Sequence, residues 1–253
     1  MAVDVPLVLA FMGVTFAPPV VLALVPLTRL QIGDRTLHLL LGFSAGLLLA
    51  IALLDLIPEA LEVAAAVGTE PHVPMYAAAA GFLTLLLAHR LLAREGGHFH
   101  EESGRRIQPF ATLALGALAV HGVVDGIVIP LGFAVGPAVG TVITLAVVFH
   151  QVPDSAAALT VALASGRRGK GAAAFVLVTA LDTPAGIVLG LLLLGAGPWL
   201  VPVGLGFSAG TFLYVSAADL IPELQHRARS TLVLLAILAG TAVVGVLSVL
   251  FPA

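Results

Sequence analysis

The stretch GFSAGLLLAIALLDLIPE, which runs from Gly42 to Glu59, occurs a second time as GFSAGTFLYVSAADLIPE from Gly206 to Glu223. Eleven of the eighteen aligned positions are identical, and the alignment contains no gap. Each copy is an apolar run with acidic residues only near its end, which is the composition of a helix that spans a lipid bilayer. The repeat therefore predicts an all-α membrane protein with two related halves.

The rest of the chain has the same apolar character. Of its 253 residues, 60% are hydrophobic and 10% are charged, whereas soluble domains average about 45–50% apolar and about 25% charged residues. The mean hydropathy of +1.13 places the whole chain in lipid. With a net charge of −3 there is no basic block for nucleic acid, so we expect no nucleic-acid partner. Cysteine is absent, which excludes a thiolate metal site and a cysteine nucleophile.

Apolar runs long enough to cross about 30 Å of hydrocarbon recur along the sequence. We predict eight transmembrane helices, at about 5–27, 37–57, 74–93, 109–131, 138–163, 172–194, 200–221 and 231–251. The connections are short, so we expect residues 1–253 to form a single transmembrane domain, in which residues 94–108 connect the third and fourth helices.

The basic residues predict the orientation of these helices. All eleven lie at four alternate connections or beside them: Arg29, Arg35, Arg90, Arg94, Arg105, Arg106, Arg167, Arg168, Lys170, Arg227 and Arg229. The positive-inside rule makes those connections cytoplasmic and leaves both termini outside. The two repeat copies then cross the membrane in opposite directions, as 3+2+3 helices with helices 4 and 5 between the halves. Inverted repeats of this kind are frequent in alternating-access transporters.

Two histidine–aspartate pairs stand near the centres of the fourth and fifth predicted helices. His121 precedes Asp125, and His150 precedes Asp154, by four residues, so each pair shares one helix face. Because adjacent helices run antiparallel, His121 should lie level with Asp154 and Asp125 with His150. A carboxylate at this depth costs about 2.5–3.5 kcal/mol, which a divalent cation would offset. Mixed nitrogen and oxygen ligands favour Zn, Fe, Mn or Co over Ca or Mg.

Two other interpretations of these pairs are open. They could be structural hydrogen bonds that hold helix 4 against helix 5, or they could relay protons. Weaker candidates for metal contact lie elsewhere in the sequence. The carboxylate pairs in the repeat copies either bind the ion transiently on its way through or are solvated helix ends. The other candidates are an acid inside helix 6 and a histidine-containing loop. These residues are Asp55, Glu59, Asp219, Glu223, Asp182, His98 and His100.

Glycine spacing in the repeat predicts close helix packing. Gly42 and Gly46, like Gly206 and Gly210, are four residues apart and place small residues on one helix face. These spacings also permit a homodimer without requiring one.

The motifs together resemble the ZIP family of metal transporters. HGVVDG at 121–126, HQVPDS at 150–155 and the GFSAG…DLIPE stretches carry this resemblance. In that family helix 4 typically reads HNxxDG or HNxxEG, and helix 5 reads H/Q-x-x-P-D/E/H. The resemblance covers almost the whole chain. It implies eight helices in a 3+2+3 inverted repeat, outward termini, and movement of zinc or another first-row divalent metal toward the cytoplasm by an elevator-like motion.

The resemblance also implies site residues. The positions that match the family's primary ligands are His121, Asp125, His150 and Asp154, and Asp219 matches an acid near the inner exit.

The sequence departs from relatives that bind two adjacent metals. Gly122 and Gln151 stand where those relatives have an asparagine and an acid, and Thr183 stands at the bridging carboxylate of helix 6. Asp182 lies one residue earlier and points about 100° away from Thr183 on an ideal helix. We therefore expect one mononuclear centre, with Gln151 as a neutral auxiliary ligand.

Two functions compete with metal transport. An intramembrane metal-dependent hydrolase needs an open coordination position and a general base, and the sequence contains no HExxH. A proton or solute transporter would use the histidine–aspartate pairs as a relay. We expect a transporter rather than an enzyme, in the cell membrane, with zinc or a similar ion as substrate rather than as cofactor. The preferred metal and any proton coupling do not follow from the sequence.

Overall fold

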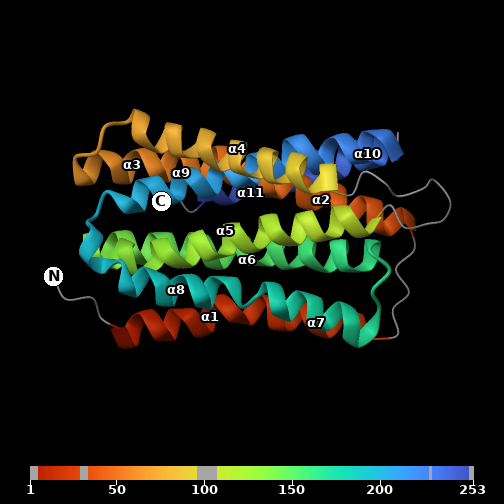
Figure 1. Ribbon diagram of the computed structural model, residues 1–253, viewed down its shortest axis with the longest axis horizontal. Coiled ribbons are helices and arrows are strands. Elements are labelled where there is room, and N and C mark those ends of the chain that lie inside the picture. Colours follow the sequence, from red (N-terminus) through yellow and green to blue (C-terminus); the bar gives the residue numbers. More distant parts are fainter. Residues whose placement is uncertain (1–4, 29–33, 96–106, 228–229, 251–253) are drawn as a thin grey trace.

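The computed structural model describes residues 5–28, 34–95, 107–227 and 230–250. All regular elements in these ranges are helices, and they run roughly along one common axis (Figure 1). The uninterrupted long helices are α4 (His72–Glu95), α5 (Ile107–Val135), α6 (Pro137–Ala164) and α11 (Thr231–Leu250). Helix α1 (Val5–Leu24) ends in a short 3-10 turn, Val25–Leu27.

Within the described residues, five helical stretches are long and apolar enough to cross a membrane: Val5–Leu27, His38–Val67, Leu118–Val135, Gly169–Leu192 and Leu200–Ala218. Three shorter apolar helices cover His72–Ala88, Asp154–Leu163 and Thr231–Val246. These findings confirm a polytopic helical membrane protein. The number of eight crossings stays a prediction.

Both repeat copies contain the same helical distortion, which the sequence analysis did not predict. Helix α2 (Asp34–Ile51) passes through the π-helical segment η2 (Ala52–Leu56) into α3 (Ile57–Val67). In the second copy α9 (Leu200–Leu213) passes through the π-helical segment η4 (Tyr214–Leu220) into α10 (Ile221–Arg227). Pro58 and Pro222 are each the second residue after these segments. Proline lacks an N–H and clashes with the carbonyl four residues earlier, and a wider π-helical turn accommodates both effects.

The repeat glycines bring helices into close contact, as predicted. A Cβ at Gly46 would overlap the backbone oxygen of Ile237 in α11, and a Cβ at Gly210 would overlap that of Ala78 in α4. Helix α2 therefore packs closely on α11, and α9 packs closely on α4. Because the obstructing atoms are backbone atoms, these positions have no room for a larger residue.

The helices form two groups with matching contacts. One group contains α2–α4 and α9–α11, and the other contains α1, α5, α6, α7 (Gly169–Thr179) and α8 (Asp182–Leu192) (Figure 1). Across the groups α5 contacts α9, and α6 contacts α2. Helices α2 and α9 run in opposite directions (Figure 1). The contact of α2 with α11 corresponds to that of α9 with α4, and the contact of α2 with α6 corresponds to that of α9 with α5. The packing therefore has the same twofold relation as the sequence repeat.

A candidate metal centre between α5, α6 and α9

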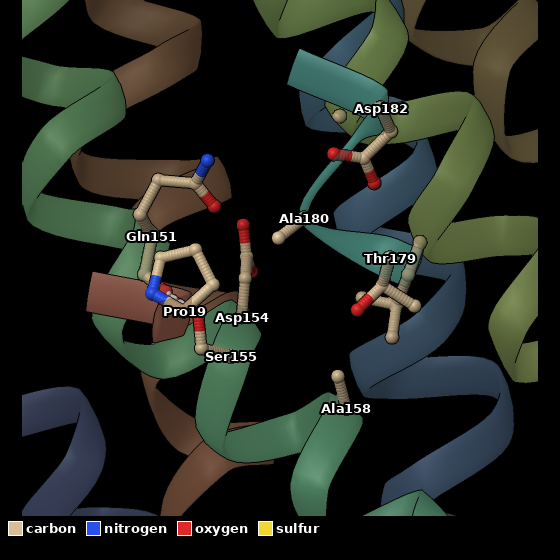
Figure 2. A pocket seen from close by; sticks show the side chains of 10 residues that line it. Pro19, Gln151, Asp154, Ser155, Ala158, Thr179, Ala180 and Asp182 are labelled. Carbon is tan, nitrogen blue, oxygen red and sulfur yellow. Dashed lines mark hydrogen bonds between the residues drawn. The ribbon is translucent and has the colours of Figure 1, made fainter. Parts of the chain in front are cut away.

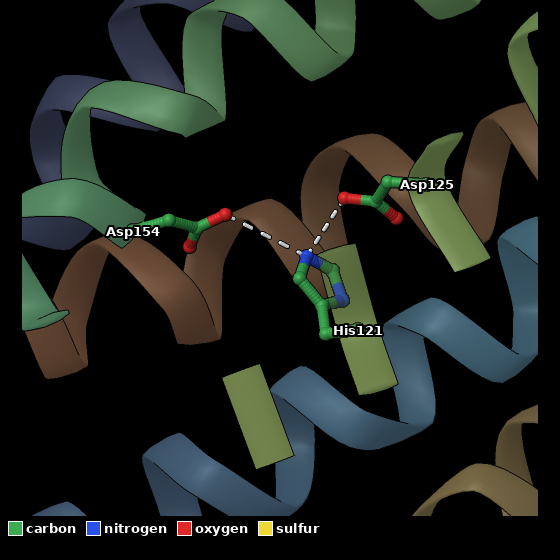
Figure 3. Close-up of side chains that lie close together, drawn as sticks. All are labelled: His121, Asp125 and Asp154. Carbon is green, nitrogen blue, oxygen red and sulfur yellow. Dashed lines mark ion pairs between the residues drawn. The ribbon is translucent and has the colours of Figure 1, made fainter. Parts of the chain in front are cut away.

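The centre of the bundle holds a buried cluster of one histidine and two carboxylates (Figure 3). His121 and Asp125 of α5 are 1% and 2% exposed. The Nε2 atom of His121 lies 2.8 Å from Oδ2 of Asp125 and 3.7 Å from Oδ2 of Asp154, which belongs to α6. The antiparallel packing of α5 and α6 thus brings His121 level with Asp154, as the spacing of the motifs predicts.

This cluster has the dimensions of a cation site. One ligand atom from each of the three residues lies within 4.8 Å of the other two. Nitrogen and oxygen ligands of zinc lie about 2.0–2.2 Å from the ion, which separates neighbouring tetrahedral ligand atoms by roughly 3.3–3.6 Å. The two distances from Nε2 fall on either side of that range. Two carboxylates gathered at a buried position also require a compensating positive charge.

Two hydroxyl groups of α9 lie beside Nδ1 of His121. Ser208 Oγ lies 2.8 Å from Nδ1 of His121 and also donates a hydrogen bond to Oδ1 of Asp125. Thr211 Oγ1 lies 3.2 Å from the same Nδ1. Sequence reasoning missed both residues and assigned the GFSAG segment to packing alone. The available signal was a pair of hydroxyls, three residues apart, inside an apolar glycine-containing helix.

A cavity of about 20 Å³ adjoins the cluster (Figure 2). That volume holds one or two water molecules. Asp154 and Asp182 reach it from different helices, and Gln151, Ser155 and Ala158 of α6 also line it. Gln151 precedes Asp154 along α6, and Ser155 and Ala158 follow it, so the cavity lies beside Asp154 on this helix.

The sixth predicted span is broken beside this cavity. Helix α7 ends at Thr179 and α8 begins at Asp182, because Pro184 has no N–H to offer the carbonyl four residues earlier. Oδ1 of Asp182 accepts the backbone N–H of Thr183 at 2.6 Å. Asp182 is the first residue of the new helix and Thr183 is the second, so the expected offset of about 100° between them remains a prediction.

Gly122 makes room for the carboxyl group of Asp182. A Cβ at Gly122 would overlap the carboxyl carbon of Asp182 and lie 2.5 Å from both of its oxygens. Gly122 stands where an asparagine was expected in helix 4, and the carboxyl group of Asp182 on α8 occupies the space beside it.

The Gly122–Asp182 contact leads to a testable coupling. We expect Gly122→Ala to lower the thermal stability of the detergent-solubilised protein, because the new methyl displaces the Asp182 carboxyl group. In an Asp182→Ala background the same change should stabilise the helix, since alanine is favoured over glycine in a helix by about 0.5–1 kcal/mol. Thermal melts of the four proteins in this double-mutant cycle measure the coupling, for which we expect about 0.5–3 kcal/mol. Equal effects of Gly122→Ala in both backgrounds would contradict the contact.

The other predicted site residues lie outside the three-residue cluster. Gln151 is buried, and its Nε2 donates to Oγ1 of Thr183 at 2.9 Å, which joins α6 to α8. Asp55 is half-buried in η2, and Glu59 is buried in α3. The described residues contain no other group of three potential ligands. The side chains of His150, Asp219 and Glu223 lie outside the part that the structure describes, as do His98 and His100.

Comparisons with known proteins point to one family. A family profile described as ZIP zinc transporter matches residues 93–248. The chain is 33% identical over 156 residues to the mouse zinc transporter SLC39A7, and this alignment covers 56% of this chain and 32% of that protein. It is 28% identical over 262 residues to the zinc transporter ZIP1 of Takifugu rubripes, and this alignment covers 85% of each protein.

The extent of these matches decides what they establish. The alignment with the mouse relative spans about a third of that protein's length. The family profile, by contrast, covers more than half of this chain and includes His121, Asp125 and Asp154. The chain belongs to the ZIP zinc transporter family.

Proposed function

We propose that this protein moves divalent transition-metal ions, foremost zinc, across the cell membrane toward the cytoplasm. The observation that carries the proposal is the buried cluster of His121, Asp125 and Asp154. His150 is the fourth ligand in this proposal, by its spacing from Asp154. The ion is a substrate that passes through a single mononuclear site.

The proposed topology has eight crossings with both termini outside. The three shorter apolar helices overlap the three predicted spans that are not among the five long candidates. The connection between α6 and α7 carries Arg167, Arg168 and Lys170, so the positive-inside rule places it in the cytoplasm. Release of the ion on the inner side is part of this proposal.

Movement between the two groups of helices would provide alternating access. All three described ligands belong to the group of α1 and α5–α8, whereas Ser208 and Thr211 belong to the other group. A displacement of one group against the other would therefore carry the cluster as a unit, with the repeat relating the inward and outward arrangements. Asp55 with Glu59, and Asp219 with Glu223, are proposed contacts for the ion on its way to and from the cluster.

Zinc uptake into proteoliposomes tests this function. We expect saturable uptake by the wild-type protein and no uptake above the leak of empty vesicles by a His121→Ala/Asp154→Ala double variant. Glu70→Gln, a change in the exposed connection between α3 and α4, is the control and should transport normally. Cadmium and iron run alongside would rank the substrates.

The same vesicles separate the competing functions. Equal leak of zinc through wild-type and double-variant vesicles would contradict metal transport. A proton flux that does not depend on metal would favour the relay, and hydrolysis of a substrate without ion movement would favour the enzyme.

A further inference from the structure

We propose that Ser208 is a positioning residue that holds the imidazole of His121 with its Nε2 lone pair directed at the cation. The inference rests on the proposed function, because it concerns how that metal site is prepared. Ser208 belongs to α9, in the group of helices opposite to α5 and α6, and is fully buried.

The hydrogen atoms of the two hydroxyls determine which role the hydroxyls can take toward Nδ1 of His121. A hydroxyl group has one hydrogen to donate. Ser208 Oγ donates its hydrogen to Oδ1 of Asp125, and carboxylate oxygens only accept. Thr211 Oγ1 donates its hydrogen to the backbone oxygen of Ser208 at 2.7 Å. Both hydroxyls can therefore only accept from His121, so in a neutral ring that binds a cation through Nε2 the hydrogen lies on Nδ1, where these two acceptors face it.

The tautomer fixes what Nε2 can do. With the hydrogen on Nδ1, the lone pair of the neutral imidazole lies on Nε2, which faces Oδ2 of Asp125 and Oδ2 of Asp154. Three electron-rich atoms then converge, and a cation between them satisfies all three. A hydrogen bond at the second nitrogen commonly sets the tautomer and the ring orientation of a metal-bound histidine.

Ser208 also acts on a second member of the cluster. Its bond to Oδ1 of Asp125 leaves Oδ2 of that carboxylate next to Nε2. One hydroxyl therefore orients both side chains that α5 contributes. The ring of Phe212, whose centroid lies 3.5 Å from that of His121, packs beside the same imidazole from α9.

Zinc binding by the purified full-length chain in detergent tests this role. Calorimetric titrations of zinc should show that Ser208→Ala weakens binding by about 10–100-fold, the range found when a metal site loses an outer hydrogen-bond partner. Ser216→Ala is the matched control. Ser216 follows α9 in η4, is equally buried and donates to the backbone oxygen of Phe212 in its own chain segment. The other repeat copy has alanine at this position, Ala52.

A spectroscopic measurement on the wild-type protein gives a readout that general destabilisation would not change. Nitrogen-15 NMR of histidine-labelled protein with bound zinc should show His121 protonated at Nδ1 and metal-bound at Nε2, with the resonance assigned by its loss in His121→Ala. Metal bound at Nδ1 would overturn the inference. So would zinc binding by folded Ser208→Ala that is as tight as in the wild type.

The outcomes also separate this inference from the proposed function. If the wild type binds zinc and Ser208→Ala binds it equally well, the positioning role fails and metal transport stands. If the wild-type protein binds no zinc, both fail. If Ser208→Ala does not fold, the NMR measurement on the wild type still decides where the metal binds on His121.

Discussion

Asp125→Asn is expected to weaken zinc binding by at least about 100-fold and to abolish saturable zinc uptake. The substitution keeps the shape of the side chain but removes a negative charge 2.8 Å from Nε2 of His121. It also replaces one acceptor oxygen with an NH₂ group, which presents hydrogens where the cation should sit. Loss of an outer hydrogen-bond partner already costs about 10–100-fold in metal affinity, so loss of a charged ligand should reach at least the upper end.

Calorimetric titration in detergent and uptake in proteoliposomes measure the two effects separately. Asp182→Asn makes the comparison specific, since Asp182 lines the cavity beside Asp154 but lies outside the three-residue cluster. A mononuclear site predicts one zinc ion per chain in both the wild type and Asp182→Asn. Two ions in the wild type and one in Asp182→Asn would show a second site that includes Asp182. Normal binding by Asp125→Asn would remove Asp125 from the ligand set.

Gly126→Val should have the second large effect, by separating α5 from α8. A Cβ at Gly126 would overlap the backbone oxygen of Thr183 and lie 2.7 Å from the Cα of Gly186. Backbone atoms cannot rotate out of the way, so the two helices must move apart. Overpacking of a well-filled interior costs about 1–3 kcal/mol and sometimes more. Because Asp125 is the preceding residue, the displacement should also lower zinc affinity.

Gly116 provides the control on the same helix. A Cβ at Gly116 meets nothing within 4 Å, whereas the one at Gly126 meets α8. Thermal melts in detergent, followed by zinc titration, should show a loss of stability for Gly126→Val and little change for Gly116→Val. If the two variants have the same melting temperature, the close approach of α5 and α8 is wrong.

The sequence predicted features of the fold that depend on composition and spacing. Long apolar runs predicted the helices, and the two GFSAG segments predicted close glycine-mediated packing, which Gly46 and Gly210 show. The i,i+4 spacing on adjacent antiparallel helices placed His121 beside Asp154. Each of these conclusions requires only local geometry and one neighbour along the chain.

Features that depend on a distant segment or on proline geometry escaped the prediction. Ser208 meets His121 across 87 residues of sequence, and nothing in the sequence of α9 shows which helix it faces. Prolines 58 and 222 are compatible with a kink, a break or a π-helical turn, and the choice depends on surrounding packing. Similarly, the break before Asp182 arises near Pro184, yet the pairing of Asp182 with Gly122 depends on how α8 packs against α5.

The size of the cavity beside Asp154 has a consequence for ion choice. With about 20 Å³, it admits one or two water molecules, so an ion surrounded by six waters cannot occupy it intact. An ion that takes the proposed path through this cavity would exchange most of its hydration shell for protein ligands. Magnesium gives up its water reluctantly and prefers oxygen in octahedral geometry, whereas zinc accepts four ligands that include imidazole. Dehydration beside Asp154 should therefore discriminate against magnesium before affinity at His121 contributes.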